Sequence, residues 1–85
     1  TGFYYACWKG HFQAVKLLIQ NSKSLKLDLN KANEDGLTGF HSACKNKHEE
    51  IVDYIINNAE EFGIDLSLNT KIGKTGYDLW PEKFA

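Results

Sequence analysis

A short string recurs along this chain at a constant interval. TGFYYAC begins at Thr1, TGFHSAC begins at Thr38 and TGYDLW begins at Thr75, so successive copies start 37 residues apart. Residues 1–37 align with residues 38–74 without a gap and are identical at 12 positions. Self-similarity at a fixed period of about 20–50 residues indicates stacked copies of one small structural unit.

Length and charge exclude several other classes of protein. The chain has 85 residues, which suffices for one small domain. Ten basic and eleven acidic residues give a formal net charge of −1, which provides no electrostatic basis for binding nucleic acid. No apolar run approaches the roughly 18 residues of a membrane span. We therefore expect neither nucleic-acid binding nor membrane insertion.

Each copy predicts two helices, a tight turn between them and an extended turn after them. The Thr that opens each copy can cap a short helix, whose apolar residues follow at helical spacing. The longer helix carries an apolar stripe at i, i+1, i+4 and i+5. The predicted helices span residues 1–9, 11–25, 38–46 and 48–62, and the predicted extended turns span 28–37 and 65–74.

Several motifs follow one another in a familiar order. They are ACWKGH (residues 6–11), AVKLLI (14–19), DLNKANEDG (28–36) and GLTGFHSAC (36–44). On these motifs the chain resembles the ankyrin repeat family. The resemblance implies an all-α solenoid, in which antiparallel helix pairs stack and are joined by extended turns. It also implies a concave surface of short helices and turn tips that binds other proteins.

On this interpretation the chain is one segment of about two and a third units. The units are residues 1–37, residues 38–74 and a partial third unit over 75–85, where Pro81 should stop or kink the first helix. Repeat arrays usually need at least three units and polar end caps. We therefore expect a fragment of a longer array, or a chain whose open ends are covered by something else.

The chain departs from the family pattern in three ways. The cap Thr is followed by Gly rather than Pro, which gives up a preorganised start to the helix. The motif His occurs only as His41, whereas Asp78 can form a capping box with Thr75. The period exceeds the usual 33 residues by close to one helical turn, which should lengthen the second helix and let Leu25 and Phe62 continue its stripe.

Cysteine and histidine recur at equivalent positions, one repeat apart. Stacked helices lie about 8–10 Å apart, whereas a disulfide needs Cα atoms within about 7 Å, so we expect no bond between Cys7 and Cys44. Free, buried thiols suit a reducing, intracellular compartment, cytoplasmic or nuclear. His11 and His48 are too far apart to share a metal, and we interpret them as helix-start residues that bond to a neighbouring turn.

No motif points to catalysis. The adjacent Glu residues at 49–50 and 60–61 point apart on a helix, as on a solvated face. A Gly-rich phosphate loop, a Gly-x-Ser-x-Gly elbow and a His-Glu-x-x-His motif are all missing from the sequence. We therefore expect no enzyme activity, no cofactor and no metal site.

One set of residues is suited to binding a partner. Tyr and Trp at positions 5 and 8 fall on the short helix away from its core stripe, and such residues are enriched at interface hot spots. The alternative for Trp8 is that it folds over an exposed end and covers apolar surface. The candidate partner-binding residues are Tyr5, Trp8, Lys9, Asn33, Glu34, Ser42, Lys45, Asn46, Lys71 and Ile72.

The resulting hypothesis is a non-catalytic protein–protein interaction module whose partner is another protein. Two alternatives stay open: a structural spacer within a longer solenoid, and a targeting or scaffolding arm of a larger multidomain protein or enzyme. Self-association through the open repeat ends is a further way in which the chain could find a partner.

Overall fold

The computed structural model describes residues 2–85, and within them the secondary structure consists of seven helices and no strands. The helices are α1 (Gly2–Lys9), α2 (Phe12–Gln20), α3 (Ser22–Leu25), α4 (Gly39–Lys45), α5 (Glu49–Phe62), α6 (Gly76–Leu79) and α7 (Pro81–Phe84). None of these helices is long and apolar enough to cross a lipid bilayer.

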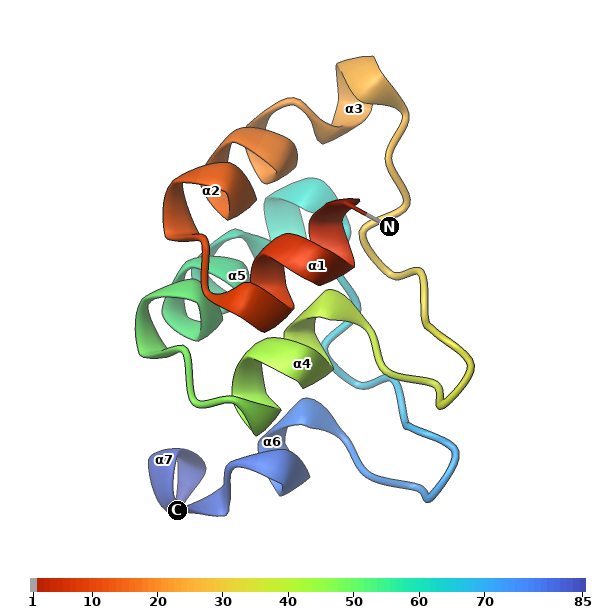
Figure 1. The fold of residues 1–85 in the computed structure, drawn as a ribbon, viewed down its shortest axis with the longest axis vertical. Helices are drawn as coiled ribbons and strands as arrows, with labels where there is room; N and C mark the ends of the chain where they lie inside the picture. The colour runs from red at the N-terminus through yellow and green to blue at the C-terminus, as the bar shows by residue number, and fades with distance from the viewer. Residues whose placement is uncertain (1) are drawn as a thin grey trace.

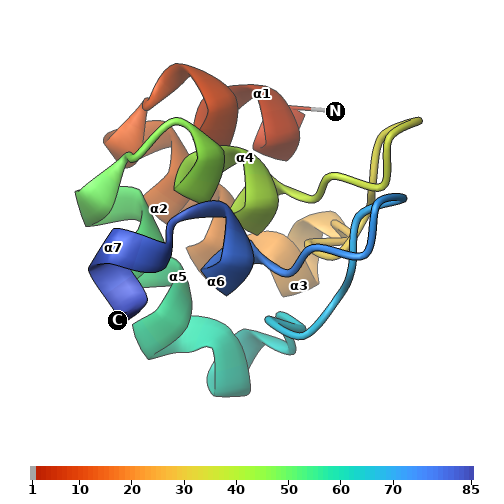
Figure 2. The ribbon, with the colours of Figure 1, turned by 90° about the horizontal axis from the view of Figure 1, so that it is seen from below.

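The helices form two stacked layers (Figures 1 and 2). The short helices α1, α4 and α6 pack side by side in one layer, and α2 packs against α5 in the other. The two long connections, residues 26–38 and 63–75, project to one side as loops that run next to each other. The helical stack expected from the repeats is therefore the observed fold.

The hydrophobic core lies between the two layers. Both layers contribute the residues that recur in the two copies, and burial of such side chains is the main stabilising term in folding. Cys7, Val15, Ile19, Ala43, Cys44, Val52 and Ile55 are fully buried, and Phe3, Ala6, Phe40 and Ile51 lie beside them. The apolar stripes predicted for these helices are confirmed.

Capping boxes fix the starts of α4 and α6. Thr38 Oγ1 accepts from the His41 backbone N–H, and the Thr38 N–H donates to His41 Nδ1 at 2.9 Å. Because Nδ1 accepts, Nε2 carries the ring proton and donates to the Leu68 carbonyl at 2.7 Å. The predicted box of Thr75 and Asp78 is also present, while the predicted cap at Thr1 lies outside the described residues.

The prediction of one continuous helix over residues 11–25 is wrong. The chain turns at Asn21 and separates α2 from α3, because the side chains of Ser22 and Ser24 bond back to the backbone there. Asn21 Nδ2 donates to the Leu17 carbonyl, Ser22 Oγ to that of Ile19, and Ser24 Oγ to that of Asn21.

The break redirects the end of the apolar stripe in the first copy. Leu25 was expected to continue the stripe but is 57% exposed. In the second copy α5 runs without interruption to Phe62, which is half-buried against the core as predicted. The extra helical turn therefore extends the core in the second copy only.

Gly39 and Gly76, two of the three glycines that replace the family's Pro, are required by close packing. A Cβ on Gly39 would lie 2.6 Å from Phe3 Cε2, and a Cβ on Gly76 would lie 2.3 Å from Phe40 Cε2. Each phenylalanine ring therefore lies directly over the first residue of the next short helix. Glycine gives up the preorganised helix start that proline would provide, because only glycine leaves room for these rings so close to the backbone.

The third unit ends in a short helix that is held against α5. Trp80 interrupts the helix before Pro81, as the proline predicted. Lys83 Nζ in α7 lies 3.0 Å from Asp53 Oδ1 and 3.6 Å from Glu49 Oε1, and it also lies over the Trp80 ring. These contacts fasten α7 to the start of α5.

Candidate partner-binding surface

An exposed aromatic cluster lies on α1. The Tyr5 and Trp8 side chains are 52% and 45% exposed, and their rings meet edge to face with centroids 6.2 Å apart. Lys9 Nζ lies 4.6 Å from the centroid of the Trp8 ring, within the range of a cation–π contact. The cluster presents two large rings and one positive charge to solvent.

The backbone beneath this cluster is fixed by the second unit. The Trp8 carbonyl accepts from His48 Nε2 at 2.9 Å and from Asn46 Nδ2 at 3.2 Å. The predicted bond from His48 to a neighbouring turn is therefore confirmed. Asn46 is exposed, but its amide already serves to hold the end of α1.

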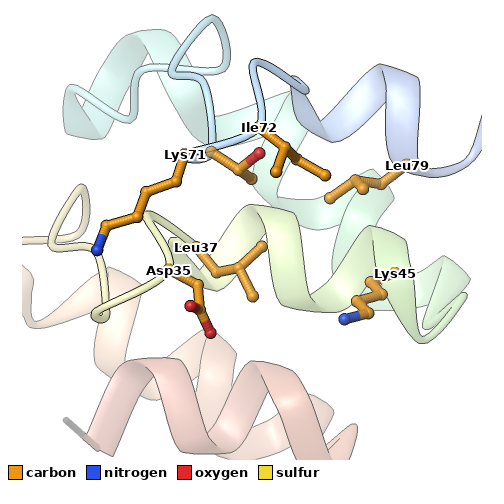
Figure 3. Close-up of a pocket in the computed structure, with 7 residues that line it drawn as sticks. Asp35, Leu37, Lys45, Lys71, Ile72 and Leu79 are labelled. Carbon is orange, nitrogen blue, oxygen red and sulfur yellow. The ribbon is translucent and has the colours of Figure 1, made fainter.

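A groove opens between the loops and the short helices (Figure 3). It has a volume of about 230 Å³, and its lining residues come from two loops and two helices: Asp35, Leu37, Lys45, Thr70, Lys71, Ile72 and Leu79. Leu37, Ile72 and Leu79 point toward one another and give the groove an apolar centre. Lys71 and Lys45 lie at its opposite ends.

Local hydrogen bonds set the shape of the loop tips that flank the groove. Asn33 Oδ1 accepts from the backbone N–H groups of Asp35 and Leu37, an arrangement typical of Asn in tight turns. The two tips are then joined, because the Lys71 N–H donates to the Asp35 carbonyl at 3.1 Å. Gly36 has a φ of +77° at this contact, and a Cβ there would lie 2.9 Å from the Lys71 nitrogen.

Comparison with known protein families agrees with this architecture. A family model described as "Ankyrin repeats (3 copies)" matches residues 1–75. The chain belongs to the ankyrin repeat family. Ankyrin repeats are generally protein–protein interaction modules and are typically non-catalytic. A search of curated proteins finds no match to this chain.

The ankyrin fold brings together only part of the predicted binding set. Lys45, Lys71 and Ile72 meet at the groove, and Tyr5, Trp8 and Lys9 form the cluster on α1. Glu34 is exposed at a loop tip. Asn33 is also exposed, although Nδ2 donates to the Tyr4 hydroxyl and Oδ1 holds the turn.

The expectation that Ser42 is displayed is wrong. Its side chain is only 2% exposed, and Oγ donates to the Gly39 carbonyl within α4. The physical reason is that α4 lies between α1 and α6 and is covered on both sides, whereas Tyr5 on α1 stays exposed. In this ankyrin stack, Ser42 is therefore a packing residue.

Sequence reasoning missed four residues that line the groove: Asp35, Leu37, Thr70 and Leu79. Leu79 could have been found from the repeat itself, because it stands 37 residues after Ser42 and 74 after Tyr5. Asp35 and Leu37 precede Thr38 in the first loop, and Thr70 lies in the second. Their role depends on how the two loops pair, which the sequence pattern does not specify.

The two thiols of this ankyrin segment are buried and unreactive in character. Cys7 and Cys44 are both free cysteines, and burial raises the pKa of each thiol to about 12. The positive charge of Lys83 opposes the rise in the pKa of Cys44 but does not offset the desolvation. At neutral pH both thiols are protonated and serve as small packing residues.

Proposed function

We propose that this chain is a non-catalytic protein-binding module that presents side chains of its short helices and loop tips on a concave surface. Tyr5, Trp8 and Lys9 form one part of this surface, and the groove beside Lys45, Lys71 and Ile72 forms the other. The observation that carries the proposal is that Trp8 is 45% exposed while its own carbonyl is held by two side chains of the next unit.

Rigid display explains how such a surface would bind. Association loses affinity when side chains and loops must be ordered, and a fixed backbone reduces that loss. Trp and Tyr are the residue types most enriched among interface hot spots. In the described residues, Trp8 makes ring contacts with Tyr5 and Lys9 and does not belong to the hydrophobic core. This favours a partner anchor over an end-covering role.

We further propose the division into units over residues 1–37, 38–74 and 75–85, since the helix pairs repeat on that spacing. Two free, buried thiols support an intracellular location, in the cytoplasm or nucleus.

The test is capture of partners with the wild-type protein and with Trp8→Ala, followed by affinity measurement for each captured partner. Trp8→Ala should weaken binding more than about tenfold, because truncating an aromatic hot spot typically loses at least about 2 kcal/mol. The matched control is Leu17→Ala, which also truncates an exposed apolar side chain, 59% exposed, but on α2. It should change affinity less than about twofold.

Circular dichroism should show that both variants keep the wild-type helical signal. A folded Trp8→Ala variant that binds as tightly as wild type would contradict the proposal. The chain would then be better described as a structural spacer or as a scaffolding arm.

A further inference from the structure

The geometry points to one kind of occupant for the groove between the second and third units. We propose that it binds an extended protein segment with one apolar side chain that enters the groove, flanked by carboxylates on the side of α4. This inference rests on the proposed protein-binding function and assigns the chemistry of the partner. The contacts that support it lie in the groove, whereas the main support for the proposed function comes from the aromatic cluster on α1.

The apolar centre of the groove requires an apolar group from the partner. Ile72 is 78% exposed at the tip of its loop, where a β-branched apolar side chain gains nothing from its own fold. With Leu37 and Leu79 it forms three walls of a hollow of about 230 Å³. Pockets for small molecules are usually about 300–1,000 Å³, so the hollow fits a single side chain better than a cofactor.

The loops favour an extended segment over a folded surface. The two loop tips lie side by side, tied by the bond from the Lys71 N–H to the Asp35 carbonyl. The groove runs between these tips and the short helices, with Lys71 at one end and Lys45 at the other. A chain that lies along the groove would pass both lysines and place one side chain between them.

Charge gives the segment its direction. Lys45 lies in the last turn of α4, and within residues 2–85 its ammonium group has no carboxylate partner. Lys9, in the last turn of α1, adds a second positive charge at the same end of the short helices. By contrast, Lys83 already pairs with Asp53 and Glu49. The helix side of the groove is therefore positive and unsatisfied, and it complements carboxylates.

The loop side of the groove has the opposite balance. Glu34 and Asp35 are both exposed at the first tip, and Lys71 and Lys74 are exposed at the second. These charges nearly cancel, so the loop side provides no net attraction for carboxylates. An acidic partner segment would therefore orient with its carboxylates toward α1 and α4.

The experiment uses fluorescence anisotropy with labelled synthetic peptides of one length, each with a central leucine. One peptide carries aspartates on one side of the leucine, a second carries lysines there, and a third carries aspartates and a central glycine. The first peptide should bind most tightly, and its affinity should fall as salt is added. The glycine peptide should bind more than about tenfold more weakly, because it lacks the anchor.

Two variants locate the binding site. Ile72→Asp should abolish binding of the acidic peptide, and its high exposure leaves the fold intact. Lys45→Glu should weaken the acidic peptide about threefold to fivefold and strengthen the lysine peptide, as expected for an exposed charge pair. The matched control is Lys23→Glu, which makes the same charge change on α3 and should alter neither peptide.

The outcomes separate this inference from the proposed function. If the lysine peptide binds as tightly as the acidic peptide, or if Lys45→Glu acts no differently from Lys23→Glu, the assigned charge preference is overturned. In a second outcome, Ile72→Asp does not weaken the binding of any leucine peptide, but Trp8→Ala still reduces the capture of partners. The groove inference then fails and the proposed function stands. If both fail, the concave surface is not the binding site.

Discussion

Replacing Gly39 by alanine tests the packing of successive repeats. In most helices this change is favourable, because a helix that contains glycine is less stable than the same helix with alanine by about 0.5–1 kcal/mol. Here the added Cβ would lie 2.6 Å from Phe3 Cε2 and 3.0 Å from both Phe3 Cδ2 and Cys7 Sγ. The Phe3 side chain is 7% exposed and Cys7 is fully buried, so neither can move away freely.

The overlap should outweigh the gain in helix propensity. Adding a methyl group to a filled core costs about 1–3 kcal/mol. After subtraction of the propensity term, we expect the Gly39→Ala variant to lose about 1–2 kcal/mol of unfolding free energy. For a domain of this size each kcal/mol shifts the melting temperature by about 4–8 °C.

The matched control is Gly2→Ala, because a Cβ on Gly2 meets nothing within 4 Å. It should be neutral or slightly stabilising. Urea denaturation followed by circular dichroism measures both variants. In a Phe3→Leu background the cost of Gly39→Ala should shrink, since the smaller side chain leaves room for the methyl group. A Gly39→Ala protein as stable as the Gly2→Ala protein would refute the proposed ring-over-glycine contact.

Two further predictions concern the core and the broken helix. Burial raises the pKa of the Cys7 and Cys44 thiols from 9.0 to about 12 in the folded protein. As the pH rises, these thiols therefore lose their protons in the unfolded chain before they do so in the folded protein. The unfolding free energy should therefore fall above about pH 9, and less steeply when both are Ala, as urea denaturation at several pH values would show. The Ser22→Ala/Ser24→Glu double variant replaces both serines by their equivalents in the second copy, Ala59 and Glu61. It should join α2 to α3 and raise the helical circular dichroism signal. An unchanged signal would contradict the assigned cause of the break.

The stacked fold could be predicted because its determinants are local and occur twice. Gly10 and Lys47, which stand 37 residues apart, both adopt positive φ in the tight turn between helices, at +78° and +57°. The capping box of Thr75 and Asp78 was also visible in the sequence, because its two partners lie three residues apart. Features built from neighbouring residues needed no knowledge of how the units pack.

The errors arose where distant or competing contacts decide the outcome. Periodicity favoured an unbroken helix, but Ser22 and Ser24 offer the backbone alternative bonds that their counterparts Ala59 and Glu61 cannot make in the same way. The exposure of Ser42 depended on which faces of α4 its neighbours cover. The groove depended on the pairing of two loops that are far apart in the sequence.

The equivalent positions 5, 42 and 79 explain how one framework produces different surfaces. The framework residues Phe, Ala, Cys and Val recur in both copies and are buried in both. The position occupied by Tyr5, Ser42 and Leu79 has no such constraint, and the side chains there are respectively exposed, buried and part of the groove wall. Burial therefore determines the identity of the residues that stack the units. The neighbours of each unit determine whether the side chains at the remaining positions are exposed, buried or part of the groove. Specificity for a partner should reside in those of the remaining positions that reach the surface or the groove, such as Tyr5 and Leu79, because they can change with less effect on the contacts between units than the buried Ser42.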